Sequence, residues 1–71
     1  MTDTQALRKA ISEAGVSIAF LAKKAGITRE SFYQKTKNDT EFKASEIAAV
    51  SAALHLTNEQ RDSIFFATAV D

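Results

Sequence analysis

Apolar residues recur along this chain at the three- and four-residue spacing that marks helix faces. The first such face has apolar residues at positions i, i+3, i+4 and i+7, namely Leu7, Ala10, Ile11 and Ala14. This spacing brings side chains to one side of a helix. Proline is absent, and glycine occurs only at Gly15 and Gly26. Because nothing else interrupts helical structure, the pattern predicts an all-α fold.

Capping residues and glycines divide this pattern into five expected helices. Ser, Thr and Asp cap helix starts, whereas glycine ends helices in a left-handed conformation. Thr57 and Gln60 have the spacing of a capping box, and residues 38–40 predict a turn. The expected helices run from Asp3 or Thr4 to Gly15, from Ser17 to Gly26, from Thr28 to Thr36, from Ser45 to Leu54, and from Thr57 to near Val70.

The length and composition fit one small domain that spans residues 1–71. The apolar fraction of 45% is sufficient for a hydrophobic core without covalent cross-links. Cysteine is absent, so disulfides, thiolate metal sites and thiol nucleophiles are excluded. We see no signal peptide and no apolar run of membrane-spanning length. We therefore expect a cytoplasmic protein that does not contact a membrane.

Residues with catalytic potential are few and scattered. His55 is the single histidine, and Glu59 and Asp62 lie on a polar helix face where solvation is the usual role. No phosphate-binding glycine loop or nucleophile motif is present. We therefore expect no enzymatic activity, no cofactor, no metal and no small-molecule substrate, and we expect the protein to bind a macromolecule.

The most informative segment is the pair of helices between Ser17 and Lys37. Two short helices joined by a glycine-containing turn are typical of the DNA-binding helix-turn-helix. Gly26 supplies the positive φ of the turn, and Ala22 is small where the two helices approach each other. The apolar residues that would fill the space between the helices are Leu21, Ala25, Ile27 and Phe32.

This segment resembles the helix-turn-helix of the lambda-repressor-like, Cro/CI-type regulators. The continuation, residues 41–47 and 56–67, is similar to small Cro-like proteins of temperate phages that infect Gram-positive bacteria. The resemblance covers nearly the whole chain, and it is greatest to the modulator-of-repression, or antirepressor, type. It implies a compact five-helix domain whose helices 2 and 3 form the helix-turn-helix, acting in the host bacterial cytoplasm.

The resemblance also identifies candidate base-reading residues on the third helix. With Phe32 directed inward, the outward residues are Glu30, Tyr33, Gln34 and Lys37, with Arg29 at the N-terminal edge. By position, Arg29, Glu30 and Gln34 match the base-reading sites of the family. Arginine pairs with guanine, glutamine with adenine and glutamate with cytosine in the major groove. The alternative is that these residues are simply a solvated helix face.

Phosphate contacts are expected from Ser17 and Thr28 at helix N-termini, and from Lys35 and Lys37 farther along the third helix. The overall charge does not favour DNA, because nine basic and nine acidic residues cancel. Residues 23–43 are mildly basic, with six basic residues against three acidic ones. Since affinity for DNA grows with the number of neutralised phosphates, we expect a monomer to bind DNA weakly.

Some residues depart from the family pattern, and the apolar ones among them favour a protein interface. Ile18 and Phe20 are apolar where relatives place polar residues; Ile18 is expected to pack against the first helix and Phe20 to be partly exposed. Lys35 and Thr36 stand where the third helix would usually carry another apolar residue. Near the C-terminus, Phe66 and Val70 form a second apolar face, suited either to the core or to a homodimer interface. The expected protein-interface residues are Ile18, Phe20, Phe66 and Val70.

Two functions therefore follow from the sequence. In the first, the chain is a lysis–lysogeny regulator that acts with or against the phage repressor, by binding it, operator DNA, or both. In the second, it is a stand-alone Cro-like transcriptional repressor that binds operator DNA as a homodimer. The neutral charge and the apolar start of the second helix favour the first, whereas the intact helix-turn-helix pattern favours the second.

Overall fold

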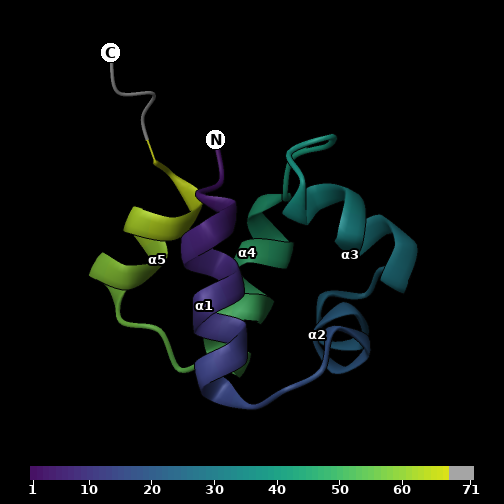
Figure 1. Cartoon of the computed structure of the whole chain (residues 1–71), viewed down its shortest axis with the longest axis horizontal. Coiled ribbons are helices and arrows are strands. Elements are labelled where there is room, and N and C mark those ends of the chain that lie inside the picture. Colours follow the sequence, from purple (N-terminus) through teal and green to yellow (C-terminus); the bar gives the residue numbers. More distant parts are fainter. Residues whose placement is uncertain (68–71) are drawn as a thin grey trace.

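The computed structural model describes residues 1–67 and contains five helices, shown in Figure 1. These are α1 (Thr4–Ala14), α2 (Ile18–Ala25), α3 (Arg29–Thr36), α4 (Ala44–Ala53) and α5 (Asn58–Phe65). Residues 1–67 form no β-strand, and none of their helices is long and apolar enough to cross a membrane. The predicted all-α fold and the number of helices are confirmed.

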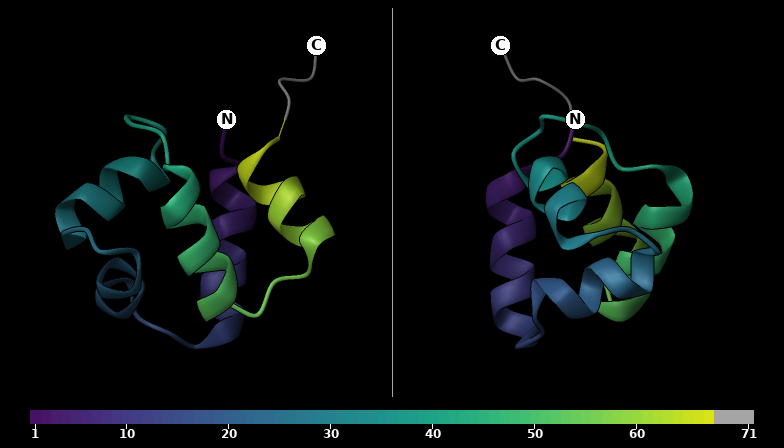
Figure 2. Two further views of the ribbon diagram at one scale, coloured as in Figure 1. Left: turned by 180° about the vertical axis from the view of Figure 1, so that it is seen from behind. Right: turned by 90° about the vertical axis from the view of Figure 1, so that its right-hand side faces the viewer.

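α4 lies between α2 on one side and α5 on the other. α5 also packs against α1, α2 also packs against α3, and α1 contacts α3. The views in Figure 2 show α2 and α3 together at one end of the molecule, with α1 and α5 at the other. The helical pair identified in the sequence is therefore exposed at an end of the domain.

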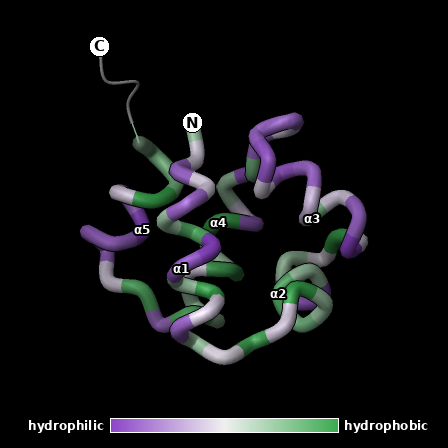
Figure 3. Tube along the Cα trace, viewed as in Figure 1, coloured by the Kyte–Doolittle hydropathy of each residue, from purple (hydrophilic) through white to green (hydrophobic). Residues whose placement is uncertain are grey.

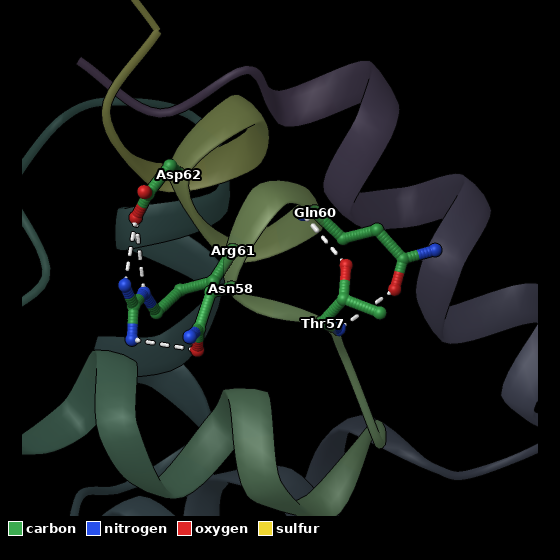
Figure 4. A network of polar contacts seen from close by, with 5 residues as sticks. All are labelled: Thr57, Asn58, Gln60, Arg61 and Asp62. Carbon is green, nitrogen blue, oxygen red and sulfur yellow. Dashed lines mark hydrogen bonds and ion pairs between the residues drawn. The ribbon is translucent and has the colours of Figure 1, made fainter.

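Side-chain caps begin four of the helices, as the sequence predicts. Asp3 Oδ1 accepts from the Ala6 amide at 3.0 Å, and Ser17, Thr28 and Thr57 each accept from the amide three residues later. At α5 the Gln60 side chain also accepts from the Thr57 amide at 2.8 Å, which completes the capping box (Figure 4). Each such cap stabilises a helix by about 1 kcal/mol.

Left-handed residues end four of the helices. Gly15 and Gly26, with φ of 70° and 75°, end α1 and α2 as predicted. Asn38 and His55 take the same role after α3 and α4, with φ of 62° and 55°. After His55, the Leu56 amide donates to the Ser51 carbonyl at 3.0 Å, the six-to-one bond of a Schellman motif.

Replacing His55 with glycine is expected to stabilise the protein by about 0.5–1 kcal/mol. A left-handed backbone costs a residue with a Cβ atom about 1–2 kcal/mol, and the greater freedom of glycine in the unfolded chain offsets part of that gain. Urea denaturation of His55→Gly measures the change. Gly26→Ala is the matched control and should lose about 1 kcal/mol, because its φ is 75° although a Cβ would meet no atom within 4 Å. A less stable His55→Gly variant would contradict the prediction.

The hydrophobic core contains residues from every helix and from the α3–α4 connection. Its aromatic part is a chain of three rings, in which Phe42 lies edge-on to Phe32 at 5.5 Å and to Phe65 at 5.3 Å between centroids. The buried apolar residues are Leu7, Ile11, Leu21, Ala22, Phe32, Phe42, Ile47, Val50, Leu54, Ile64 and Phe65.

The fifth helix is shorter than the sequence predicts: it ends at Phe65 and not near Val70. The Ile64 carbonyl accepts from the Asp3 amide at 2.7 Å, so a residue of the N-terminal segment uses the acceptor that a longer helix would use itself. The Phe66 backbone, at φ −119° and ψ 32°, has left the helical conformation. Val70 lies outside the described residues.

Candidate macromolecular interface on α2 and α3

The turn between α2 and α3 has only three residues and a defined backbone. Gly26 is left-handed, and the next amide, that of Ile27, donates to the Ala22 carbonyl at 3.0 Å. Ile27 packs against the core, and Thr28 caps α3. These contacts fix the direction in which the chain leaves α2, and they therefore fix where α3 starts.

The exposed side of α3 carries the residues that the sequence predicted to point outward. Phe32 is fully buried, whereas Tyr33 is 43% exposed. The other exposed residues of α3 and its C-terminal cap are Arg29, Glu30, Gln34 and Lys37. Figure 3 shows this helix and the turn that follows it as mainly hydrophilic, in contrast to α2. The outward orientation is confirmed; base reading by these residues stays a prediction.

An aromatic side chain lies on the outside of α2. Phe20 is 41% exposed, as predicted, and the Lys24 ammonium lies 5.4 Å from its ring centroid in a cation–π contact. Ile18 is half-buried and packs against the core, in agreement with the expectation that it folds inward. We use the name α2–α3 face for the exposed residues of the two helices other than Ala19, together with the cap of α3: Phe20, Lys23, Lys24, Arg29, Glu30, Tyr33, Gln34 and Lys37. Lys24 also lines a hollow with Ala49, Ala52 and Ala53 of α4, so this set extends toward α4.

Ser17 and Thr28, the predicted phosphate contacts at helix starts, are exposed helix caps. Ser17 Oγ accepts from the Phe20 amide and Thr28 Oγ1 accepts from the Ser31 amide, at 3.0 Å and 3.1 Å. These hydroxyls are therefore already engaged in capping. A phosphate at either site would bind the amides that the cap leaves free.

Lys35 is not the outward phosphate contact that the sequence predicted. Its side chain is only 8% exposed, and its ammonium lies 3.5 Å from Glu46 Oε1 and donates to the Glu41 carbonyl at 3.0 Å. Lys35 is three residues after the buried Phe32, so the helix turns it toward the core. The position is one at which an apolar residue was expected, and a buried ion pair occupies it.

The burial of Lys35 also lowers the positive charge available to a partner. The exposed basic residues between positions 23 and 43 are Lys23, Lys24, Arg29, Lys37 and Lys43, and the exposed acidic ones are Glu30, Asp39 and Glu41. Five against three gives these exposed residues a net charge of +2. Few phosphates can be neutralised by so small an excess, so DNA affinity gains little from it.

A second exposed aromatic residue lies at the end of α5. Phe66 is 56% exposed and borders a shallow hollow of about 230 Å³, which is also lined by Ala44, Ile47, Ala48 and Arg61. Arg61 donates to Asp62 Oδ1 at 3.0 Å through two nitrogens, as Figure 4 shows. The prediction that Phe66 belongs to an exposed apolar face is consistent with its position, whereas its predicted neighbour Val70 lies outside the described residues.

Residues 1–67 offer no set of three or more His, Cys, Asp or Glu side chains arranged to hold a metal ion. Comparison of the chain with protein-family models, with curated proteins and with solved structures gives no match. The α2–α3 face is therefore interpreted from its own geometry and chemistry.

The one important contact that sequence reasoning missed is the pairing of Lys35 with Glu46. Two features of the sequence point to it when they are considered together. Lys35 is a lysine at an apolar helical position, and Glu46 is the third residue of α4, three residues after its cap Lys43. A glutamate at that position turns back toward the helix start, which is where the end of α3 lies.

Proposed function

We propose that this chain is a regulatory helix-turn-helix protein that acts with or against a phage repressor, by binding the repressor through the α2–α3 face. The observation that carries the proposal is the exposed aromatic Phe20 on the first helix of the pair, next in space to Lys24. Tyr33 and Arg29 on α3 add two residue types that are enriched at protein interfaces. The resemblance of residues 17–37 to Cro/CI-type regulators supports the regulatory role.

Charge supports a protein as the primary partner. A net charge of +2 on the exposed residues between positions 23 and 43, with Glu30 on the exposed side of α3, is a weak basis for holding a polyanion. Binding to a protein requires no such excess, because aromatic and arginine side chains contribute most of the affinity at such interfaces.

The alternative function is stand-alone repression, in which a homodimer binds operator DNA. It is favoured by the exposure of Arg29, Glu30 and Gln34 on the first two turns of α3, since residues there reach base edges in helix-turn-helix proteins. Phe66, exposed at the end of α5, would then be part of the dimer contact.

A gel-shift titration separates the two functions. The DNA is the control region of the lysis–lysogeny switch of the phage. The chain is added to it at low salt, first alone and then together with the cognate repressor. We expect no shift with the chain alone, and loss or alteration of the repressor's own shift. A specific shift by the chain alone that weakens steeply with salt would establish the alternative instead.

Variants of the α2–α3 face should affect the two partners differently. Phe20→Asp is expected to weaken repressor binding by about 30-fold, the loss typical of an aromatic anchor, with little effect on any DNA shift. Arg29→Glu with Lys37→Glu should abolish DNA binding because it adds repulsion from phosphates. Isothermal titration and gel shifts measure the two effects, and Lys9→Glu, an exposed charge reversal on α1, is the control. Equal losses of repressor binding in Phe20→Asp and Lys9→Glu would contradict the proposed contact.

A further inference from the structure

An ion pair is buried where the last turn of α3 meets the first turn of α4. The Lys35 ammonium and Glu46 Oε1 are 3.5 Å apart, and the two side chains are 8% and 5% exposed. This pair contrasts with Arg61 and Asp62 on α5, which are also paired but are 37% and 58% exposed. Neither Lys35 nor Glu46 belongs to the α2–α3 face.

The pair is the centre of a small network that joins three segments. Lys35 donates to the Glu41 carbonyl at 3.0 Å, and Glu46 Oε1 accepts from the Lys43 amide at 2.9 Å. The network therefore connects the end of α3, residues 41–43 of the connection, and the start of α4. Both contacts lie in the last three residues of that connection, next to the start of α4.

The position of Lys35 along α3 determines how the network can affect the orientation of the helix. Only three residues of α3 are buried: Phe32, Lys35 and Thr36. Phe32 is the apolar anchor, and its ring lies against Phe42. The Thr36 hydroxyl donates to the Tyr33 carbonyl within α3 itself at 2.7 Å, whereas Lys35 pairs with a residue of another helix. This polar contact, one turn after Phe32, opposes rotation of α3 about its own axis. Rolling would redirect every residue of the exposed side.

Stability alone does not explain an ion pair at this position. The cost of removing two charges from water often equals or exceeds their attraction, and apolar residues of similar volume then give equal or better stability. An ion pair has a preferred geometry that apolar contacts lack, because its donors and acceptors must meet at fixed distances. The ion pair therefore fixes the relative orientation of the two helix ends, whereas apolar residues at the same positions would only fill the space between them.

We propose that the Lys35–Glu46 pair is a positioning device, which fixes the rotation of α3 against α4 and so determines which side chains the α2–α3 face presents. The pair contacts no partner itself. Its effect on partner binding rests on the proposed function, whereas its effect on the orientation of α3 does not.

The test variant is Lys35→Met with Glu46→Gln, which removes both charges together. Methionine keeps the length of the lysine stem, and glutamine keeps an oxygen for the Lys43 amide. We expect a thermal midpoint within a few degrees of the wild type, amide exchange in α3 at least tenfold faster with α1 unchanged, and shifted residual dipolar couplings in α3. Binding to the repressor or operator should weaken at least tenfold.

Two further variants complete the test. Lys35→Arg keeps a charged donor and should restore binding and the α3 couplings toward wild-type values. Arg61→Met with Asp62→Asn removes the exposed pair and should change neither measurement. If the buried double variant does not fold, Lys35→Leu with Glu46→Gln, which also leaves no uncompensated charge, is measured in the same way, with faster α3 exchange expected.

Wild-type exchange and couplings in α3 of the buried double variant, or of Lys35→Leu with Glu46→Gln in its place, would overturn the proposal. So would wild-type binding to a partner that the wild-type protein binds. If the wild-type protein binds neither repressor nor operator, the proposed function fails, while the exchange and coupling measurements still decide the role of the pair.

Discussion

Replacing Phe32 with alanine is expected to destabilise the protein by about 3–5 kcal/mol, the usual cost of removing a buried phenyl ring. The ring is fully buried and is the apolar anchor of α3. It also lies edge-on to Phe42, which in turn lies edge-on to Phe65 of α5, so the loss is felt across the core. Domains of this size have a free energy of unfolding near the lower end of about 5–15 kcal/mol. The variant should therefore be largely unfolded at low urea concentration.

Urea denaturation followed by circular dichroism at 222 nm measures this loss, and Phe66→Ala is the matched control. Phe66 is the same residue type but is 56% exposed, so its truncation should change the free energy of unfolding by about 0.5 kcal/mol or less. Equal losses in the two variants would show that Phe32 is not the anchor that the structure indicates.

Replacing Glu46 with alanine is expected to cost about 3 kcal/mol or more, because it leaves the buried ammonium of Lys35 without a counter-charge. It also removes the acceptor for the Lys43 amide at the start of α4. Removal of both charges together should recover most of this loss, since no uncompensated charge is then left inside.

The control is Asp62→Ala, which breaks an ion pair of the opposite kind. Arg61 and Asp62 are neighbours on α5 and are largely solvated, and such exposed pairs contribute between about 0 and 1 kcal/mol. Chemical denaturation of both variants at one salt concentration compares them directly. If Glu46→Ala loses no more free energy of unfolding than Asp62→Ala, the Lys35 ammonium must become solvated when its partner is removed.

The fold was largely predictable because its signals are local. The caps Asp3, Ser17, Thr28 and Thr57 bind amides three residues away, and Gly26 turns the chain through its own φ. Such interactions are visible in a short stretch of sequence. The same applies to the exposed side of α3, because Phe32, the one large apolar residue of the helix that is buried, determines the direction of its helical neighbours.

The two errors both concern long-range contacts. The role of Lys35 depends on Glu46, a residue of another helix, and the end of α5 depends on the Asp3 amide, which donates to the Ile64 carbonyl. No periodicity in the sequence reports such pairs. Helical spacing alone therefore predicts a phosphate contact for Lys35 and a longer fifth helix than the structure has.

The hydrogen bond between the Asp3 amide and the Ile64 carbonyl has a consequence for how the chain folds. It closes a loop of some sixty residues. The loss of chain entropy on closing a loop of that length costs about 4 kcal/mol, which the contacts formed afterwards must offset. The contact between α2 and α3 closes a much shorter loop and costs less chain entropy, so it is expected to form early. The meeting of α1 with α5 would then come late, and the rate-limiting barrier would be set by an encounter between the two ends of the domain.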